Sequence, residues 1–455
     1  MNTQLLRDGV AYADLWLAHQ RAQREVPGTV LAIEHDSEIM LSKGYGWANI
    51  EQQAQMTPRH IFRIASHSKT FTATAVMLLV ERSQLRLDDR ASHYLDWLDA
   101  PVTIRQLLNH VGGITRDGLE SDFWQLERKF PDVAELQRIA HGVLEPNTQF
   151  KYSNIGFGLL GQVIERASGQ PYNAFVKAEI VDRLRLVDTG PETHPGMTNR
   201  LVTGYTPYRP GLPRLPIADT DTRALSSATG FYSTAEDLCR FGRAHYFGNA
   251  ELLTDASKRE MQQPYWTVPE ADQSYGLGFA VHTIGKGRMI GHGGGFPGHS
   301  TTTLIDPDAR LVVVVLNNTH GTVGLASPLA VGIVKILDFA LSSGDEPRHW
   351  SPERYAGRFM NLGGITDIAC FGSKILAFNP DEADPTAHAT ELEVVDADTL
   401  RIARTSGYGS PGETVRYERT PDGAISALRF GGARCLPSTV YETYFRGLSQ
   451  VAVTP

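Results

Sequence analysis

Apolar and polar positions along the chain predict one antiparallel sheet that is assembled from two distant segments. The first 25 or so residues have the pattern of a single amphipathic helix. Apolar runs at 28–35 and 38–48 flank Asp36-Ser37 and predict a β-hairpin. Strand-like runs return after residue 273, and "LVVVVL" (311–316) is apolar throughout, as is typical of a central strand. We therefore expect an α/β (α+β) fold with an antiparallel sheet flanked by helices.

The segment between these strands has a helical pattern. A helix is predicted to begin at Ile64 in "IASHSKTFTATAVMLLVE" (64–81), and shorter helical patterns follow at 103–110 and 155–169. Another helix is predicted over 327–343. We therefore expect residues 1–342 to form one domain with a helical insertion at about 70–245.

The last hundred residues differ from the rest. Residues 343–355 are polar, contain two prolines and predict a linker. From 356 to 455, short β-like runs alternate with Gly, Pro and Asp turns. This pattern predicts a small antiparallel β-barrel of lipocalin-like size.

Composition and charge exclude several classes of function. The chain has 41% hydrophobic and 21% charged residues, as a folded globular protein does. Its formal net charge is −8 and it has no basic run of five or more, which argues against a nucleic-acid partner. No stretch approaches the ~18 apolar residues of a membrane span, and the first residues lack the apolar core of a signal peptide. We therefore expect a cytoplasmic protein without a membrane partner.

The cysteines suggest neither a metal site nor a disulfide framework. Cys239, Cys370 and Cys435 lie far apart and do not have metal-ligand spacing. We therefore expect no metal and no cofactor.

Ser66 and Lys69 are the first residues that suggest chemistry. Positions i and i+3 share a helix face, so both side chains point the same way. Backbone N–H groups are unpaired in a first helical turn, where the dipole is positive. A serine there can act as nucleophile, a neutral lysine as its base, and the serine N–H as half an oxyanion hole. The alternative is that Ser66 only caps the helix, because Ser-x-x-Lys also occurs by chance.

Tyr152-Ser153-Asn154 is the only Tyr-x-Asn in the chain and precedes an apolar helical pattern. A phenol near a lysine ammonium sheds its proton more easily and can relay it. Asn154 can hydrogen-bond a substrate amide. The alternative is a packed tyrosine followed by an asparagine cap.

His292-Gly293-Gly294 lies at the edge of a predicted strand. Glycine lets a ligand approach the backbone, and strand-edge N–H groups can complete an oxyanion hole. The alternative is a glycine turn with an incidental histidine. A second His-x-Gly begins at His110, but it follows a helix and precedes the Tyr-x-Asn motif, so it is not the candidate.

In this order, Ser-x-x-Lys, Tyr-x-Asn and His-x-Gly resemble the motifs of the serine β-lactamase and penicillin-binding-protein superfamily. The resemblance is greatest to its class C-like branch, which includes esterases and D-aminopeptidases, and covers roughly residues 10–342. The segments "FRIASHSKTFTA", "TIRQLLNHVGGI", "FKYSNIGFGLLG" and "STAEDLCRF" occur in family order. The chain lacks the Ser-Asp-Asn of class A, and it has Val111-Gly112 where relatives often have Thr-Ser.

The resemblance implies a role for each matching residue and no cofactor. It also implies a helical domain above the sheet and, less specifically, an appended barrel as in D-aminopeptidase-like members. The roles are nucleophile (Ser66), base partner (Lys69), proton relay (Tyr152), substrate contact (Asn154), the position where many members carry lysine (His292), and the oxyanion backbone (Ser66 and Gly295, with Gly294 beside it).

His292 shifts the expected substrate class. A lysine there would bring a fixed positive charge that suits a substrate carboxylate, whereas histidine, with a reference pKa near ~6.5, is mostly neutral at pH 7. This favours aminopeptidase, amidase or esterase action on a small molecule or short peptide, with D preference and a homo-oligomer left open. The alternatives are a carboxylesterase or acyltransferase of the same fold, and a sensor that is acylated without turnover.

Overall fold

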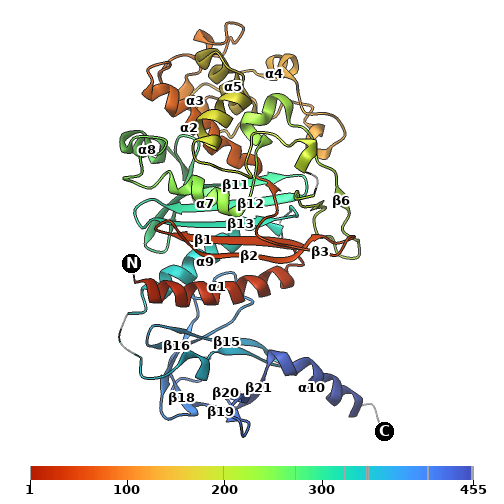
Figure 1. Ribbon diagram of the computed structural model, residues 1–455, viewed down its shortest axis with the longest axis vertical. Coiled ribbons are helices and arrows are strands. Elements are labelled where there is room, and N and C mark those ends of the chain that lie inside the picture. The colour runs from red at the N-terminus through yellow and green to blue at the C-terminus, as the bar shows by residue number, and fades with distance from the viewer. Residues whose placement is uncertain are drawn as a thin grey trace. The chain divides into compact units, whose positions relative to one another are not determined.

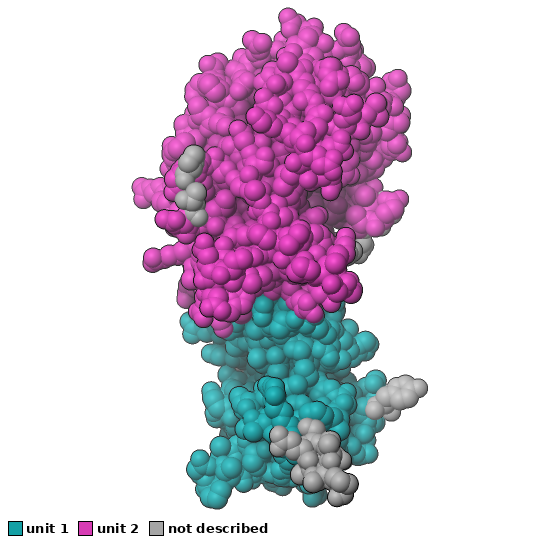
Figure 2. Space-filling model, turned by 90° about the vertical axis from the view of Figure 1, so that its right-hand side faces the viewer, with its two compact units in different colours: residues 1–23, 331–455 teal, residues 24–330 magenta. Residues whose placement is uncertain are grey.

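The computed structural model describes residues 2–197, 199–271, 273–321, 324–344, 346, 348–406 and 409–451. The chain forms two compact units, one of residues Arg24–Ala330 and one of Met1–Gln23 with Val331–Pro455 (Figure 2). The predicted linker at 343–355 lies in the second unit, and its residues 345 and 347 are outside the described part. The domain boundaries drawn from the sequence stay a prediction.

The larger unit is built on an antiparallel sheet (Figure 1). Among the described residues it has nine strands, in the order β3-β2-β1-β13-β12-β11-β10-β9-β8. The strand β13 pairs with β1, Thr29 opposite Asn317, and with β12 on its other side. Every residue of β13 is buried, as the apolar run predicted. The prediction that two distant segments complete one sheet is confirmed.

The bounds of these strands are β1 (Gly28–His35), β2 (Glu38–Asn49), β3 (Ala54–Gln55), β8 (Trp266–Val268), β9 (Gln273–Tyr275), β10 (Ala280–Ile284), β11 (Gly287–Phe296), β12 (His299–Asp306) and β13 (Leu311–Asn317). Two short pairs lie outside the sheet, β4 (Phe62–Arg63) with β7 (Tyr232–Ser233) and β5 (Gly204–Tyr205) with β6 (Pro216–Ile217).

Helices pack on the sheet and on one another in the same unit. The helix α7 packs against β13, β1 and β12, and so covers one face of the sheet. The helix α2 packs against α5, and its residues from Ser68 to Leu79 are all buried. The bounds are α2 (Ser68–Glu81), α3 (Ile104–Leu108), α4 (Val133–Ile139), α5 (Asn154–Ser168), α6 (Tyr172–Val176), α7 (Ala235–Arg243) and α8 (Asp255–Gln262).

The smaller unit contains a closed antiparallel barrel, whose described strands run from β14 to β21 in chain order. Leu400 and Ile402 of β18 face the barrel core, whereas Arg401 between them is exposed. The predicted C-terminal barrel is therefore confirmed. The bounds are β14 (Gly357–Asn361), β15 (Gly364–Phe371), β16 (Lys374–Phe378), β17 (Thr390–Val394), β18 (Thr399–Arg404), β19 (Thr414–Arg419), β20 (Ile425–Phe430) and β21 (Ala433–Pro437).

Three helices complete the chain. The first, α1 (Thr3–Gln23), is the helix predicted at the N-terminus. The second, α9 (Ala326–Leu341), begins in the larger unit and ends in the smaller one, and α10 (Ser438–Val451) follows the barrel. None of the helices in the described part of the chain combines the length and apolar character needed to cross a bilayer.

Buried histidines of the larger unit, among them His67, His245 and His299, make its stability depend on pH. Burial lowers the pKa of His67 to about 4, of His245 to about 3 and of His299 to about 4. Histidine in an unfolded chain titrates near ~6.5, so between about pH 4 and 6.5 the unfolded chain binds protons that the folded chain excludes. Above pH 6.5 these histidines therefore do not reduce the free energy of unfolding. It falls below that pH by up to about 1.4 kcal/mol per pH unit for each histidine.

We expect the guanidinium midpoint of unfolding to decrease as the pH is lowered from 7 to 4.5. His245→Gln should flatten this dependence, because it removes one proton that is taken up on unfolding. His388→Gln is the matched control, since the side chain of His388 is 73% exposed. Equal slopes for His245→Gln and the parent protein would contradict the prediction.

Candidate active site

Ser66 lies in an anchored turn that joins β4 to α2. The turn is a 3-10 helix (Ala65–His67), and Ala65 has a φ of +51°, which costs a residue with a side chain about 1 kcal/mol or more. The Oγ of Ser68 donates to the carbonyl of Ala65 at 2.6 Å and accepts from the N–H of Phe231 at 3.0 Å. The α-helix thus begins at Ser68, whereas the sequence predicted a start at Ile64, because the left-handed Ala65 interrupts the helical backbone.

The strand β11 runs next to this turn. A Cβ on Gly294 would lie 2.2 Å from the carbonyl oxygen of Ile64, so only glycine permits the approach. Gly293 and Gly295 border the cavity described below, whereas Gly294 lies against the turn. The candidate oxyanion donors, the N–H groups of Ser66 and Gly295, therefore come from two adjoining backbone segments.

Lys69 is fully buried on the first turn of α2, beside Ser66. Its Nζ is 3.2 Å from the Oγ of Ser66, 2.7 Å from the Oδ1 of Asn154 and 2.8 Å from the carbonyl of Ala228. Burial lowers the pKa of Lys69 well below its ordinary value, although Asp117 nearby opposes this shift. A neutral amine has two N–H groups and one lone pair. The amide oxygen of Asn154 and the carbonyl of Ala228 can only accept, so they take the two N–H groups. The lone pair of neutral Lys69 is then left to accept from the hydroxyl of Ser66.

Tyr152 lies in the loop before α5 and is hydrogen-bonded to Ser66. Its ring centre is 4.8 Å from the Nζ of Lys69. Burial raises the pKa of Tyr152 above its ordinary value, and the hydrogen bond to Ser66 lowers it only in part. The sequence interpretation that a lysine ammonium would loosen the phenolic proton is therefore not what the site displays. In the resting site Tyr152 is protonated, and Lys69 has the lowered pKa.

Asn154 is the first residue of α5, and Asp117 orients its side chain. The Nδ2 of Asn154 donates to the Oδ1 of Asp117 at 2.7 Å, and its Oδ1 accepts from Lys69. The same Oδ1 of Asp117 accepts from the Nε1 of Trp124 at 3.1 Å. One N–H of the Asn154 amide group is thus left for a substrate contact of the kind predicted.

His292 projects from β11, and both of its ring nitrogens are engaged. Its Nδ1 is 2.5 Å from the carbonyl of Gly293, which can only accept, so Nδ1 carries the proton. The hydroxyl of Tyr275 then donates to Nε2 at 2.9 Å. Burial and the proximity of Lys69 lower the pKa of His292 well below its ordinary value. His292 is therefore neutral at pH 7 and held in one orientation.

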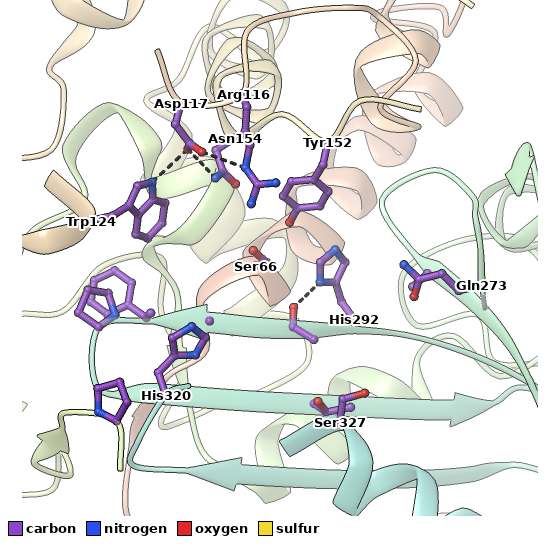
Figure 3. A pocket seen from close by; sticks show the side chains of 18 of the residues that line it. Ser66, Arg116, Asp117, Trp124, Tyr152, Asn154, Gln273, His292, His320 and Ser327 are labelled. Carbon is purple, nitrogen blue, oxygen red and sulfur yellow. Dashed lines mark hydrogen bonds and ion pairs between the residues drawn. The ribbon is translucent and has the colours of Figure 1, made fainter. Parts of the chain in front are cut away.

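These side chains border one cavity of about 910 Å³ (Figure 3). Apolar side chains of Trp124, Leu126, Phe150, Ile217 and Phe296 form much of its wall. In the described part of the chain, no group of three or more His, Cys, Asp or Glu side chains is arranged to hold a metal ion. The predicted residues that border the cavity are Ser66, Tyr152, Asn154, His292 and Gly295, and Lys69 lies behind Ser66.

The family of the chain follows from a comparison with known protein families. The model of the beta-lactamase family matches residues 13–336, which is well over half of the chain. The chain belongs to the beta-lactamase family. The resemblance inferred from the three motifs is thereby confirmed, and the site described above lies within the matched residues.

Individual members of the beta-lactamase family are similar over much of the chain. Penicillin-binding protein 4* of Bacillus subtilis (strain 168) is 29% identical over 309 residues, which cover 64% of this chain and 68% of that protein. The D-amino acid amidase of Ochrobactrum anthropi SV3 is 26% identical, with a TM-score of 0.61 over 74% of this chain and 98% of that one. The matched part spans 64 to 68% of the length of the curated relatives.

Solved structures also match nearly the whole chain. The octameric penicillin-binding protein homologue from Pyrococcus abyssi has a TM-score of 0.65 at 22% identity, over 94% of this chain and 99% of that one. At this identity the match concerns the fold.

Three residues of the site were not among the predicted site residues, and two of them, Asp117 and Tyr275, belong to none of the motifs. Asp117 orients Asn154, and Tyr275 orients His292. The ring of His110, which was set aside as the weaker His-x-Gly, packs at a tilt against the ring of Tyr152, with 4.2 Å between the ring centres. Its Nδ1 accepts from the N–H of Ser153 at 3.2 Å. An aspartate or tyrosine at an unremarkable spacing gives no signal before the fold brings it to a partner.

Proposed function

We propose that this beta-lactamase-family protein is a serine hydrolase that cleaves small amide substrates through an acyl-enzyme on Ser66. One observation carries the proposal: the Oγ of Ser66 is 3.2 Å from the Nζ of a buried lysine whose pKa burial lowers. A neutral lysine beside a serine is the arrangement that activates a hydroxyl nucleophile. The cavity in front of Ser66 has room for a small substrate.

The proposed reaction uses groups that are already in contact. Neutral Lys69 takes the proton of the Ser66 hydroxyl while Oγ attacks the substrate carbonyl carbon. The N–H groups of Ser66 and Gly295 stabilise the oxyanion. The leaving amine receives a proton through Tyr152, which Lys69 restores, so that the acyl group remains on Ser66. The same groups then take a proton from water as its oxygen bonds to the acyl carbon. The bond from that carbon to Oγ breaks, Oγ regains the proton, and the acid is released.

One line of support concerns the amide bond, and a second concerns the charge of the substrate. The D-amino acid amidase of Ochrobactrum anthropi is 26% identical over 74% of this chain, and its name supports amide hydrolysis with D preference. The third motif has a neutral histidine whose nitrogens are engaged within the protein. A substrate therefore does not need a carboxylate to pair with His292.

A substrate panel tests this proposal. We expect turnover of D-alanine p-nitroanilide and of further D-aminoacyl amides at higher kcat/KM than their L counterparts, with free and blocked amines compared in each pair. Hydrolysis of p-nitrophenyl acetate alone would instead indicate a carboxylesterase. A single stoichiometric burst with every substrate would indicate an acylated sensor. Either result would contradict the proposed amide hydrolysis.

A further inference from the structure

Arg116 is a cation at the mouth of the cavity that no motif marks. Its backbone is fixed, because the carbonyl of Arg116 accepts from the N–H groups of Asn154 at 3.0 Å and Ile155 at 3.1 Å. The neighbouring carbonyl of Thr115 accepts from the Oγ of Ser153 at 2.6 Å. The loop that carries Arg116 is thus tied to the start of α5, which also carries Asn154.

The guanidinium of Arg116 faces the cavity. Its side chain is 65% exposed, and its Nε donates to the Oδ2 of Asp117 at 3.1 Å. Within the described residues, its two terminal NH₂ groups make no hydrogen bond to the protein. Figure 3 shows the guanidinium between Asn154 and Tyr152, directed towards Ser66. Four N–H donors of a fixed cation are therefore available beside the nucleophile.

Three further charged or titratable groups near Ser66, those of Lys69, His292 and Asp117, are already engaged. Among the described residues that border the cavity, Arg116 is the only arginine or lysine. Lys69 is fully buried and hydrogen-bonded, and both ring nitrogens of His292 have protein partners. Asp117 accepts from Arg116, Asn154 and Trp124. The cavity thus offers a bidentate donor for an anion, and its one carboxylate is occupied by protein donors.

We propose that Arg116 binds a carboxylate of the substrate, so that the preferred substrates of this site are anionic. The inference rests on the proposed function, because it names the substrate class of the same site. Arg116 supplies, from the helical side of the cavity, the permanent positive charge that His292 does not provide. The carboxylate belongs either to the acyl part of the substrate or to its leaving group, and both positions can be tested.

Two matched pairs of substrates separate these positions. Glutaryl-p-nitroanilide and valeryl-p-nitroanilide differ in a carboxylate on the acyl part. The compound 4-acetoxybenzoate and its methyl ester differ in a carboxylate on the leaving group. We expect Arg116→Gln to lower kcat/KM for the anionic member of one pair by about 10- to 100-fold, the usual range for a charged hydrogen bond. The kcat/KM for the neutral member should change less than about 3-fold. Arg116→Lys should restore part of the kcat/KM that Arg116→Gln loses for the anionic member.

The control is Arg138→Gln, which removes one positive charge from a side chain that is 68% exposed and does not border the cavity. Added salt should reduce the preference for the anionic member in the parent protein. Equal losses for both members of each pair would overturn the inference, because Arg116, 5.4 Å from the ring centre of Tyr152, would then act on the proton relay. An unchanged preference in Arg116→Gln would overturn it as well.

Binding to the Ser66→Ala protein tests the inference without turnover. Calorimetry should show tighter binding of one anionic member than of its neutral partner, and the difference should vanish in Ser66→Ala/Arg116→Gln. If the parent protein hydrolyses no substrate but this difference is found, the proposed function fails and the anion site stands. If the neutral substrates are hydrolysed and no difference is found, the function stands and the anion site fails.

Discussion

Replacing Ser66 by alanine is expected to lower kcat/KM by about 10³-fold or more, with the fold intact. The Oγ of Ser66 is the atom on which the acyl group would be carried, and the 3.2 Å contact with Lys69 activates it. Nothing else in the described cavity offers a serine hydroxyl next to a buried lysine. The measurement is steady-state hydrolysis of the preferred amide, with circular dichroism to verify folding.

Ser327→Ala is the matched control for that experiment. Ser327 also borders the cavity and is exposed, so its replacement removes a hydroxyl from the same surface. We expect its activity to stay within about 3-fold of the parent, as surface substitutions away from a reacting group usually do. An active Ser66→Ala protein would contradict the assignment of the nucleophile.

Lys69 and Tyr152 are expected to act as one unit with Ser66. Lys69→Met and Tyr152→Phe should each lower kcat/KM by about 10²-fold or more, and the double variant should lose little beyond the worse single variant. The physical reason is that both groups serve the same proton, since Ser66 is hydrogen-bonded to both. Full additivity of the two losses would show that they act on separate steps.

The pH dependence of kcat/KM reports the protonation state of Lys69. Burial lowers its pKa, and only the neutral amine can accept the hydroxyl proton. Activity should therefore be full above that pKa and fall as the pH decreases through it, at a pH well below the ordinary lysine value of ~10.4. An activity that increased with acidification through this range would show that the charged form of Lys69 is required.

Much of the fold could be predicted because each pattern of apolar and polar residues is compatible with one kind of structure. The run "LVVVVL" is favourable only where both faces of a strand are covered, and every residue of β13 is buried. The short β-like runs between Gly, Pro and Asp turns predicted the barrel, and in β18 the side chains of Leu400 and Ile402 are buried whereas Arg401 is exposed. The start of α2 was predicted too early, because a left-handed backbone conformation is expected at glycine and position 65 is an alanine.

The candidate site was predicted only where its residues belong to a short motif. Ser66 and Lys69 are three residues apart, so local geometry brings them together. Asp117 and Asn154 are separated by 37 residues, and Tyr275 and His292 by 17, so only the folded chain reveals these contacts. The raised pKa of Tyr152 could not be predicted from the tripeptide Tyr152-Ser153-Asn154, because it comes from burial in the folded chain, which outweighs the neighbouring charges.

The most direct test of the account is to find which side chain is acylated. The full chain is treated with a fluorophosphonate or a slowly hydrolysed amide, digested, and examined by mass spectrometry. We expect one adduct per chain, on the peptide that contains Ser66, and none in the Ser66→Ala protein. An adduct on another serine, together with activity in Ser66→Ala, would contradict it.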